Sequence, residues 1–319
     1  MEEREALLKE RETFEARWRA WGRSYGEHAG FVLAAVCGAR EKILSLGQEG
    51  RQVVALRSGE YRAWDPETLG VDEVAEGYFL QRIREVYGDS VAILSEEAGR
   101  LPEGGAIRYY LVSDPFDGSL LYKRQIPAFW YTTLAIYSAQ GEPLAAAVCD
   151  VPNGIVDFAN EGQAFTGRLV EGELVQVQPM RPSAVGALKE AVLETYMMKV
   201  PRLYPASEVW KPLLSQVRFI LPNGGPAGYA DVARGAVDIY LALEEAHIEN
   251  FSALPIAWAA GLVVTDFEGN PVHFEDNIAK RYFLVCTSNP ALHEQVLEVI
   301  QQIPWRQHPH YARILAEGA

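Results

Sequence analysis

The chain has 319 residues, of which 49% are hydrophobic and 23% charged, so it can bury a sizeable core as one large domain or two close-packed halves. A formal net charge of −14, without a Lys/Arg-rich run, argues against a protein that binds the phosphate backbone of DNA or RNA. Three distant cysteines and the absence of a long apolar run predict no disulfide framework, no zinc site, no membrane partner and a cytoplasmic location.

The first part of the chain predicts helices followed by a sheet. Apolar residues recur at intervals of three and four over residues 4–46, which predicts two helices, and again over residues 71–87, which predicts a third. From residue 91 to residue 179, short β-rich runs are joined by turns that contain Gly or Pro. This rhythm predicts a largely antiparallel sheet.

After residue 186 strands and helices alternate, as in an α/β unit. We expect strands near 188–195, 218–223, 238–243 and 281–288, and helices near 205–215, 228–236, 252–261 and 289–303. The sequence therefore predicts an α+β protein with an N-terminal half over residues 1–182 and a C-terminal α/β half over residues 183–319.

Two acidic motifs end two consecutive predicted strands. Glu96 and Glu97 follow the first strand, and Asp114 and Asp117 follow the next. A proline and a glycine in the second motif favour a tight turn, so that both aspartates can face one point. Oxygen ligands of this kind suit a hard cation such as Mg²⁺. The alternatives are an ordinary Asp-rich turn and a solvated acidic pair.

With these motifs the sequence resembles the inositol monophosphatase and fructose-1,6-bisphosphatase superfamily. The resemblance covers roughly residues 70–300 and includes LSEEAG at 94–99, SDPFDGS at 113–119, GQAFTG at 162–167 and VVTDFEGNPV at 263–272. It implies a layered αβαβα sandwich with a large antiparallel N-terminal sheet and a smaller C-terminal α/β half. It also implies Mg²⁺-dependent hydrolysis of a small phosphate monoester.

The resemblance assigns the metal ligands position by position. They are Glu96, Asp114, the backbone carbonyl of Phe116, Asp117 and Glu249. The usual Trp-Asp pair is missing near residue 249, and Glu249 is found by counting back from the later motif. Two or three Mg²⁺ ions are implied, with Mn²⁺ as an alternative ion.

Further positions are assigned to the attacking water and to the phosphate. The resemblance places Glu97 and Ser119 at the water, and Asp72 in the hydrogen-bond network behind them. For Asp72, compensation of a helix dipole is an equal alternative. The backbone amides of Gly118 and Ser119 would hold the phosphate.

Substrate recognition is assigned to the second half of the chain. Asn223 and Gly224 lie where the family presents backbone and small side chains, although an ordinary turn explains them as well. Ala242 replaces a glutamate that contacts the sugar in inositol-handling members, so inositol phosphate, fructose-1,6-bisphosphate, a nucleotide 3′-phosphate and NADP all stay open. Glu244 and Glu245 either substitute for that glutamate or form a solvated turn.

The expected partners follow from the same resemblance and, for nucleic acid, from the acidic net charge. We expect a small phosphorylated metabolite as substrate, no nucleic acid as the main partner, and a homodimer or homotetramer. The alternative function is a non-catalytic family member that binds protein or RNA. The intact acidic motifs count against this alternative.

Overall fold

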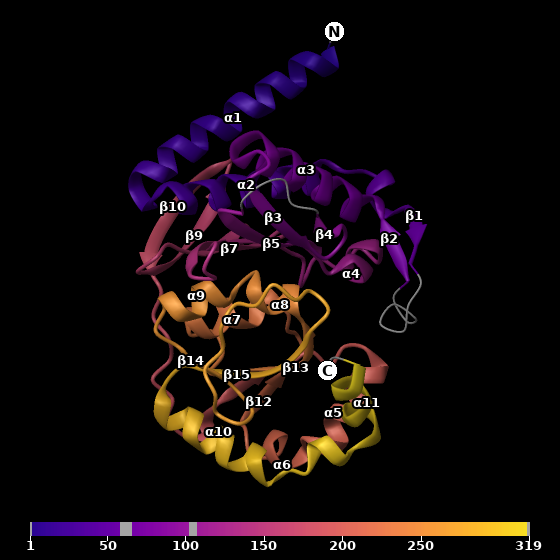
Figure 1. The fold of residues 1–319 in the computed structure, drawn as a ribbon, viewed down its shortest axis with the longest axis vertical. Coiled ribbons are helices and arrows are strands. Elements are labelled where there is room, and N and C mark those ends of the chain that lie inside the picture. Colours follow the sequence, from indigo (N-terminus) through magenta and orange to yellow (C-terminus); the bar gives the residue numbers. More distant parts are fainter. Residues whose placement is uncertain (1, 58–65, 102–106, 318–319) are drawn as a thin grey trace. The chain divides into compact units, whose positions relative to one another are not determined.

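The computed structural model describes residues 2–57, 66–101 and 107–317. Contacts along the chain define two compact units. Unit 1 comprises Met1–Asn160 and Gly167–Val177, and unit 2 comprises Glu161–Thr166 and Gln178–Ala319. Each unit has its own sheet and its own helices (Figure 1). Within the described ranges, no helix combines the length and the apolar character needed to cross a membrane.

The N-terminal part of the chain forms four helices, one 3₁₀ turn and ten strands within the described residues. In chain order these are α1 (Glu2–Tyr25), α2 (Glu27–Ser45), η1 (Glu49–Arg51), β1 (Val53–Leu56), β2 (Glu67–Leu69), α3 (Gly70–Tyr87), β3 (Val91–Ser95), β4 (Gly99–Leu101), β5 (Tyr109–Asp117), α4 (Ser119–Lys123), β6 (Tyr131–Ser138), β7 (Pro143–Asp150), β8 (Ile155–Ala159), β9 (Ala164–Val170) and β10 (Glu173–Pro179).

The large sheet has eight strands in the order β10-β9-β8-β7-β6-β5-β3-β4. Strands β5 to β8 pair antiparallel in turn, as expected. Strands β3 and β5 are parallel, because β4 folds back as a hairpin on the outer side of β3 and the chain then returns to the inner side. Their register pairs Ser95 with Ser113, so both strands end at the same edge.

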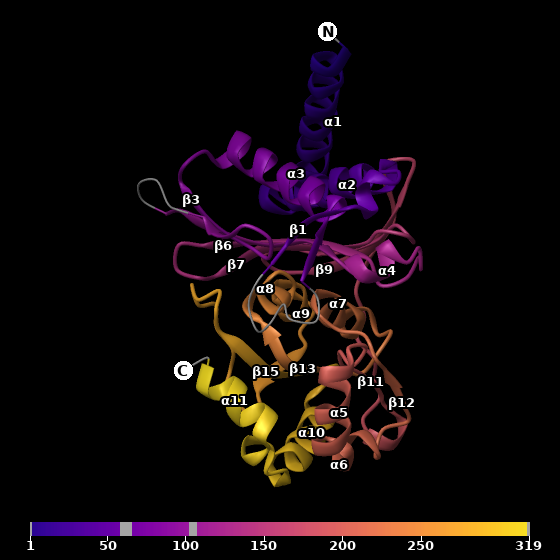
Figure 2. The same ribbon diagram turned by 90° about the vertical axis from the view of Figure 1, so that its right-hand side faces the viewer.

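Helices α2 and α3 cover one face of this sheet, and α1 packs on α2 and points away from the sheet (Figure 2). Helix α2 contacts β6, β7 and β8 on one side and α1 on the other. Its central segment, from Ala29 to Ala39, is buried all round for that reason. A helix that is apolar on every side, as this segment is, belongs in a core rather than at a surface.

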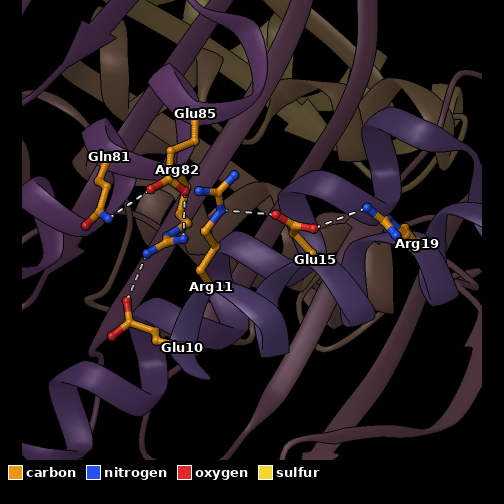
Figure 3. Close-up of polar contacts among 7 residues, drawn as sticks. All are labelled: Glu10, Arg11, Glu15, Arg19, Gln81, Arg82 and Glu85. Atoms are coloured by element: carbon orange, nitrogen blue, oxygen red, sulfur yellow. Dashed lines mark hydrogen bonds and ion pairs between the residues drawn. The ribbon is translucent and has the colours of Figure 1, made fainter. Parts of the chain in front are cut away.

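A buried arginine ties α1 to α3 (Figure 3). Arg82 of α3 is 0% exposed, and its guanidinium donates to Glu10 of α1 at 3.2 Å and to Glu85 of α3 at 2.7 Å. The same guanidinium lies over the rings of Phe14 and Tyr78. Charge-assisted hydrogen bonds and cation–π contacts together make this burial favourable.

Unit 2 is built on a five-stranded sheet in the order β12-β11-β13-β15-β14. Strand β11 runs parallel to β12 and β13, and β15 runs antiparallel to β13 and β14. Its elements are η3 (Leu188–Glu190), β11 (Val192–Glu194), α5 (Val200–Val209), α6 (Lys211–Leu214), β12 (Phe219–Leu221), α7 (Pro226–Arg234), β13 (Ile239–Ala246), α8 (His247–Phe251), α9 (Leu254–Ala259), β14 (Val263–Asp266), β15 (Arg281–Thr287), α10 (Pro290–Gln302), η4 (Trp305–Gln307) and α11 (Pro309–Glu317).

Helices cover both faces of this smaller sheet (Figure 1). Tyr240 of β13 packs against Tyr229 of α7, whereas its neighbour Leu241 belongs to the core cluster that contains Trp210 and Leu292. Successive residues of a strand point to opposite faces, which gives each face of β13 its own set of helices.

The expected α+β class is confirmed, and several elements differ in detail. The helix expected near 205–215 begins at Val200 and is broken at Trp210, and the one expected near 252–261 is α9, which a break separates from the additional helix α8 before it. A proline near the start of α6 and of α9 explains both breaks, because proline has no N–H to donate to the preceding turn. The hairpin β1–β2 and helices α4 and α11 were not expected.

Candidate functional site

The two acidic motifs meet at the edge where β3 and β5 end. Because Ser95 pairs with Ser113, the next residues, Glu96 and Asp114, are neighbours across the two strands. The backbone N–H of Glu96 donates to the Ser113 carbonyl at 3.3 Å. Asp114 is 1% exposed, and Glu96 is partly buried. The parallel pairing thus brings together two carboxylates that are distant in the sequence.

The second motif makes an irregular turn. The pairing of β5 with β6 contains a bulge between Asp114 and Asp117, where a proline lacks the N–H that a ladder needs. Gly118 has φ +100°, and a Cβ at this position would lie 2.2 Å from the Phe129 carbonyl oxygen. Only glycine fits this turn, after which α4 begins at Ser119.

Phe116 lies within this turn, and its side chain belongs to the core. The ring is 5.4 Å from that of Tyr122 and packs in the same cluster as Trp130. The side chain therefore anchors the bulged segment, and a role in metal binding falls to its backbone carbonyl alone.

Asp72 and Ser119 are in direct contact. The Ser119 hydroxyl donates to Asp72 Oδ1 at 2.7 Å, and the Leu69 backbone N–H donates to Asp72 Oδ2 at 2.7 Å. Asp72 is 3% exposed, and burial raises its pKa to about 6 although both hydrogen bonds act to lower it. Asp72 thus serves the first turn of α3 and contacts the acidic turn as well.

Glu76, one turn further along α3, is a residue that the sequence reasoning missed. It is 8% exposed and accepts a hydrogen bond from the Ser95 hydroxyl. Burial and then the charge of Glu96 raise its pKa, while the bond from Ser95 acts to lower it. Its spacing of four from Asp72 places both carboxylates on one helix face, and this spacing was the available signal.

Arg57 is a second missed residue. It follows β1, forms an ion pair with Glu97, and donates from Nη1 to the Glu96 carbonyl at 3.5 Å. The pair is only partly exposed. Arg57 therefore brings a positive charge to the first acidic motif.

The donor chemistry of this cluster suits a hard cation. Carboxylates and a backbone carbonyl are the oxygen ligands that Mg²⁺ takes. The charge of Glu96 raises the pKa of both Asp72 and Glu76, although burial contributes more. A bound cation would relieve that repulsion. As placed here, the described residues contain no group of three or more His, Cys, Asp or Glu side chains that could hold a metal, so the ligand set stays a prediction.

The remaining predicted ligand, Glu249, lies in unit 2 at the start of α8. Its Oε2 accepts a hydrogen bond from the Ala246 N–H at 2.7 Å. Burial opposes its ionisation, but a hydrogen bond from Glu245 and the charges of Arg202 and Arg281 outweigh burial and lower its pKa to about 2. Glu249 is thus an ionised carboxylate that also caps a helix.

Glu244 and Glu245 are buried, so the prediction of a solvated turn is wrong. They lie in a bulge of β13, and Glu244 has φ +55°. Arg202 of α5 lies 3.0 Å from Glu245 and 3.5 Å from Glu244, and His310 of α11 lies 2.6 Å from Glu244. Because a bulge reorients successive side chains, one arginine reaches both neighbours.

The two predicted substrate residues are tightly packed within unit 2. The Asn223 side chain is buried and donates from Nδ2 to Glu194 Oε1 at 2.8 Å. A Cβ on Gly224 would lie 2.9 Å from the Tyr196 Cβ, so packing alone favours glycine at this position. These contacts fix the loop that leads into α7.

Comparisons with known proteins agree on one family. The sequence model of the inositol monophosphatase family matches residues 32–304. The fructose-1,6-bisphosphatase/inositol-1-monophosphatase of Methanothermobacter thermautotrophicus is 26% identical over 238 residues, which are 73% of this chain and 83% of that protein. The protein of the same description from Thermococcus kodakarensis is 25% identical over 245 residues, which are 74% and 84%.

Solved structures share the fold. The extragenic suppressor protein suhB of Bartonella henselae is 20% identical, with a TM-score of 0.68 over 85% of this chain and 97% of that one. The Thermotoga maritima IMPase is 21% identical, with a TM-score of 0.65 over 85% and 96%. At these identities the likeness supports the fold alone.

Proposed function

The chain belongs to the inositol monophosphatase family, and from this premise we propose that it is an Mg²⁺-dependent phosphatase acting on a small phosphate monoester. The observation that carries the proposal is the pairing of Ser95 with Ser113, which makes neighbours of Glu96 and Asp114 at one sheet edge. A phosphatase of this type needs several carboxylates at one point to hold its metal ions.

Two relatives support the substrate class. Both carry the name fructose-1,6-bisphosphatase/inositol-1-monophosphatase, and both align with about three quarters of this chain. We propose inositol phosphates and fructose-1,6-bisphosphate as the substrate class, with the protein acting as a homodimer or homotetramer.

The proposed ligands of two or three Mg²⁺ ions are Glu96, Asp114, Asp117 and the carbonyl of Phe116. Glu249 of unit 2 is a further ligand on the strength of the resemblance alone. When bound, Mg²⁺ supplies positive charge that polarises the phosphate and makes water a better nucleophile.

The neighbouring residues orient the water and the phosphate. The Ser119 hydroxyl donates a hydrogen bond to Asp72, so the lone pairs of the Ser119 oxygen are left to accept a hydrogen bond from the attacking water. In the proposal Glu97 accepts a proton from that water, and the backbone N–H groups of Gly118 and Ser119 hold the phosphate. Asn223 and Gly224 contact the substrate by resemblance alone.

The test is phosphate release from a panel of inositol, fructose and nucleotide phosphates, with Mg²⁺ and with EDTA. Asp117→Asn should reduce turnover on the order of 10³-fold, because it removes a carboxylate from the centre that stabilises the transition state. Asp89→Asn, at an exposed turn after α3, makes the same chemical change and should leave turnover unchanged. Circular dichroism checks that both variants are folded.

The outcomes separate the two candidate functions. Magnesium-dependent release that Asp117→Asn abolishes and Asp89→Asn retains supports the phosphatase and ranks its substrates. A folded wild-type protein that releases no phosphate from any member of the panel contradicts the proposal. In that case the binding role is the function to pursue.

A further inference from the structure

Glu76 is a buried acidic group of unit 1 that the proposed mechanism does not use. It lies on α3 behind the acidic edge of the sheet, and its Oε2 accepts the hydrogen bond from the Ser95 hydroxyl. Ser95 is 0% exposed and directly precedes the proposed ligand Glu96. Glu76 therefore bonds to the side chain of the residue that directly precedes this ligand.

The second oxygen of Glu76 has no such bond. Oε1 is buried, and no described residue is its hydrogen-bond partner. A buried carboxylate oxygen without a partner costs stability, because it has lost water and gained nothing in exchange. In native structures such a group calls for an explanation, such as an ordered water, a bound ion or a functional role.

The surroundings indicate what Oε1 is suited to bind. Glu96 lies close enough for its charge to act on Glu76, and Asp72 lies one turn away on the same helix face. An anion is repelled from such a position. A water molecule held by a cation is polarised so that it is a strong hydrogen-bond donor, and it carries the positive charge that this cluster favours.

We propose that Glu76 is a positioning residue of the magnesium site: it holds Glu96 in place through Ser95, and its Oε1 accepts a hydrogen bond from a water of the hydrated cation. The inference rests on the proposed function and deepens it. Mg²⁺ usually keeps several of its waters in proteins, so a carboxylate behind the direct ligands is a chemically suitable partner.

The test is calorimetric titration of Mg²⁺ into the metal-free full-length protein. Glu76→Gln keeps the shape and a carbonyl oxygen for the Ser95 hydroxyl, but it removes the charge. We expect it to weaken Mg²⁺ binding by about 10–100-fold, the effect typical of a partner behind a metal ligand. Glu73→Gln makes the same change at an exposed position of the same helix, and it should bind Mg²⁺ like the wild type.

Thermal unfolding separates this role from a merely structural one. Without metal, Glu76→Gln should unfold at or above the temperature of the wild type, because it relieves a buried charge beside Glu96. With Mg²⁺, its gain in unfolding temperature should be smaller than that of the wild type. If Glu76 had only a structural role, metal-free Glu76→Gln would unfold at a lower temperature than the metal-free wild type.

The result that overturns the inference is wild-type Mg²⁺ affinity in Glu76→Gln, alongside wild-type protein that binds Mg²⁺ and releases phosphate. A metal-free Glu76→Gln that unfolds well below the wild type also overturns it. If the wild-type protein binds no Mg²⁺, the result contradicts the proposed function itself, and with it the inference that rests on it.

Discussion

Both units bury clusters of acidic side chains, and the two clusters differ in what they bond to. In unit 2, Glu244 and Glu245 bond to the guanidinium of Arg202, and Glu244 also bonds to His310. In unit 1, Asp72 bonds to a hydroxyl and a backbone N–H, and Glu76 bonds to a hydroxyl. In unit 2, basic side chains of the chain itself balance the acidic cluster. In unit 1, the hydrogen bonds from hydroxyl and N–H groups orient the carboxylates but do not cancel their charge.

The difference separates structural acids from functional ones. A buried ion pair holds elements together once it is formed, here α5, β13 and α11. Buried carboxylates whose charge is not cancelled contribute little to the stability of the fold, but they are suited to bind a cation. Arg57, which pairs with Glu97, is a base near the second cluster, and its charge acts to lower the pKa of Asp72 and Glu76, although burial outweighs it.

The largest expected effect tests the structural half of this comparison. Arg202→Met should lower the free energy of unfolding by about 3–5 kcal/mol, because it removes the guanidinium that contacts the buried Glu244 and Glu245 and balances the charge of Glu249. Urea unfolding followed by circular dichroism measures the loss. Arg306→Met removes an exposed pair with Glu268 in the same unit and should cost no more than about 1 kcal/mol. Equal losses of unfolding free energy in the two variants would contradict the structural role that we assign to the Arg202 cluster.

The next effect tests the functional half through pH. Burial raises the pKa of Asp72 from 3.8 to about 6, so the folded protein holds this proton more tightly than the unfolded chain does. The resulting stability is present below pH 4 and is lost as the pH rises through 6. Between pH 4 and pH 7, Asp72 should therefore lower the unfolding free energy of the metal-free wild type by roughly 2–3 kcal/mol, and Asp72→Asn should not show this loss.

Urea unfolding at a series of pH values in EDTA measures this slope, and Asp89→Asn is the matched control at an exposed position. Mg²⁺ should reduce the slope of the wild type as well, because a cation favours the ionised carboxylate. The same slope in Asp72→Asn and in the wild type would show that Asp72 is ionised throughout, as an ordinary helix-capping aspartate would be.

Local sequence chemistry was enough to predict the acidic turn. Pro115 and Gly118 restrict the backbone around Asp114 and Asp117, and such restrictions need no knowledge of distant residues. The proximity of Asp72 to Ser119 came from the resemblance, and the structure brings the two into contact.

The missed residues depend on contacts between distant segments. Arg57 reaches Glu97 only because β1 pairs with β2, and the apolar side chains of β1 are exposed, so no buried periodicity marks this strand. Glu244 and Glu245 read as a solvated turn because two adjacent acids are normally exposed. Their burial depends on a bulge and on an arginine from another element, and neither has a sequence signature here.

The smallest effect that we predict concerns the hydrogen bond from Ser119 to Asp72, which joins α4 to α3. Ser119→Ala should lower turnover by about 10–100-fold, because it removes a group that orients the attacking water without removing any carboxylate. Ser119→Thr keeps the hydroxyl and should stay within a few-fold of the wild type. Steady-state kinetics at saturating Mg²⁺ measure both. Wild-type turnover in Ser119→Ala would mean that the bond only holds α4 to α3, and the oriented carboxylates of unit 1 would then differ less from the structural acids of unit 2 than we propose.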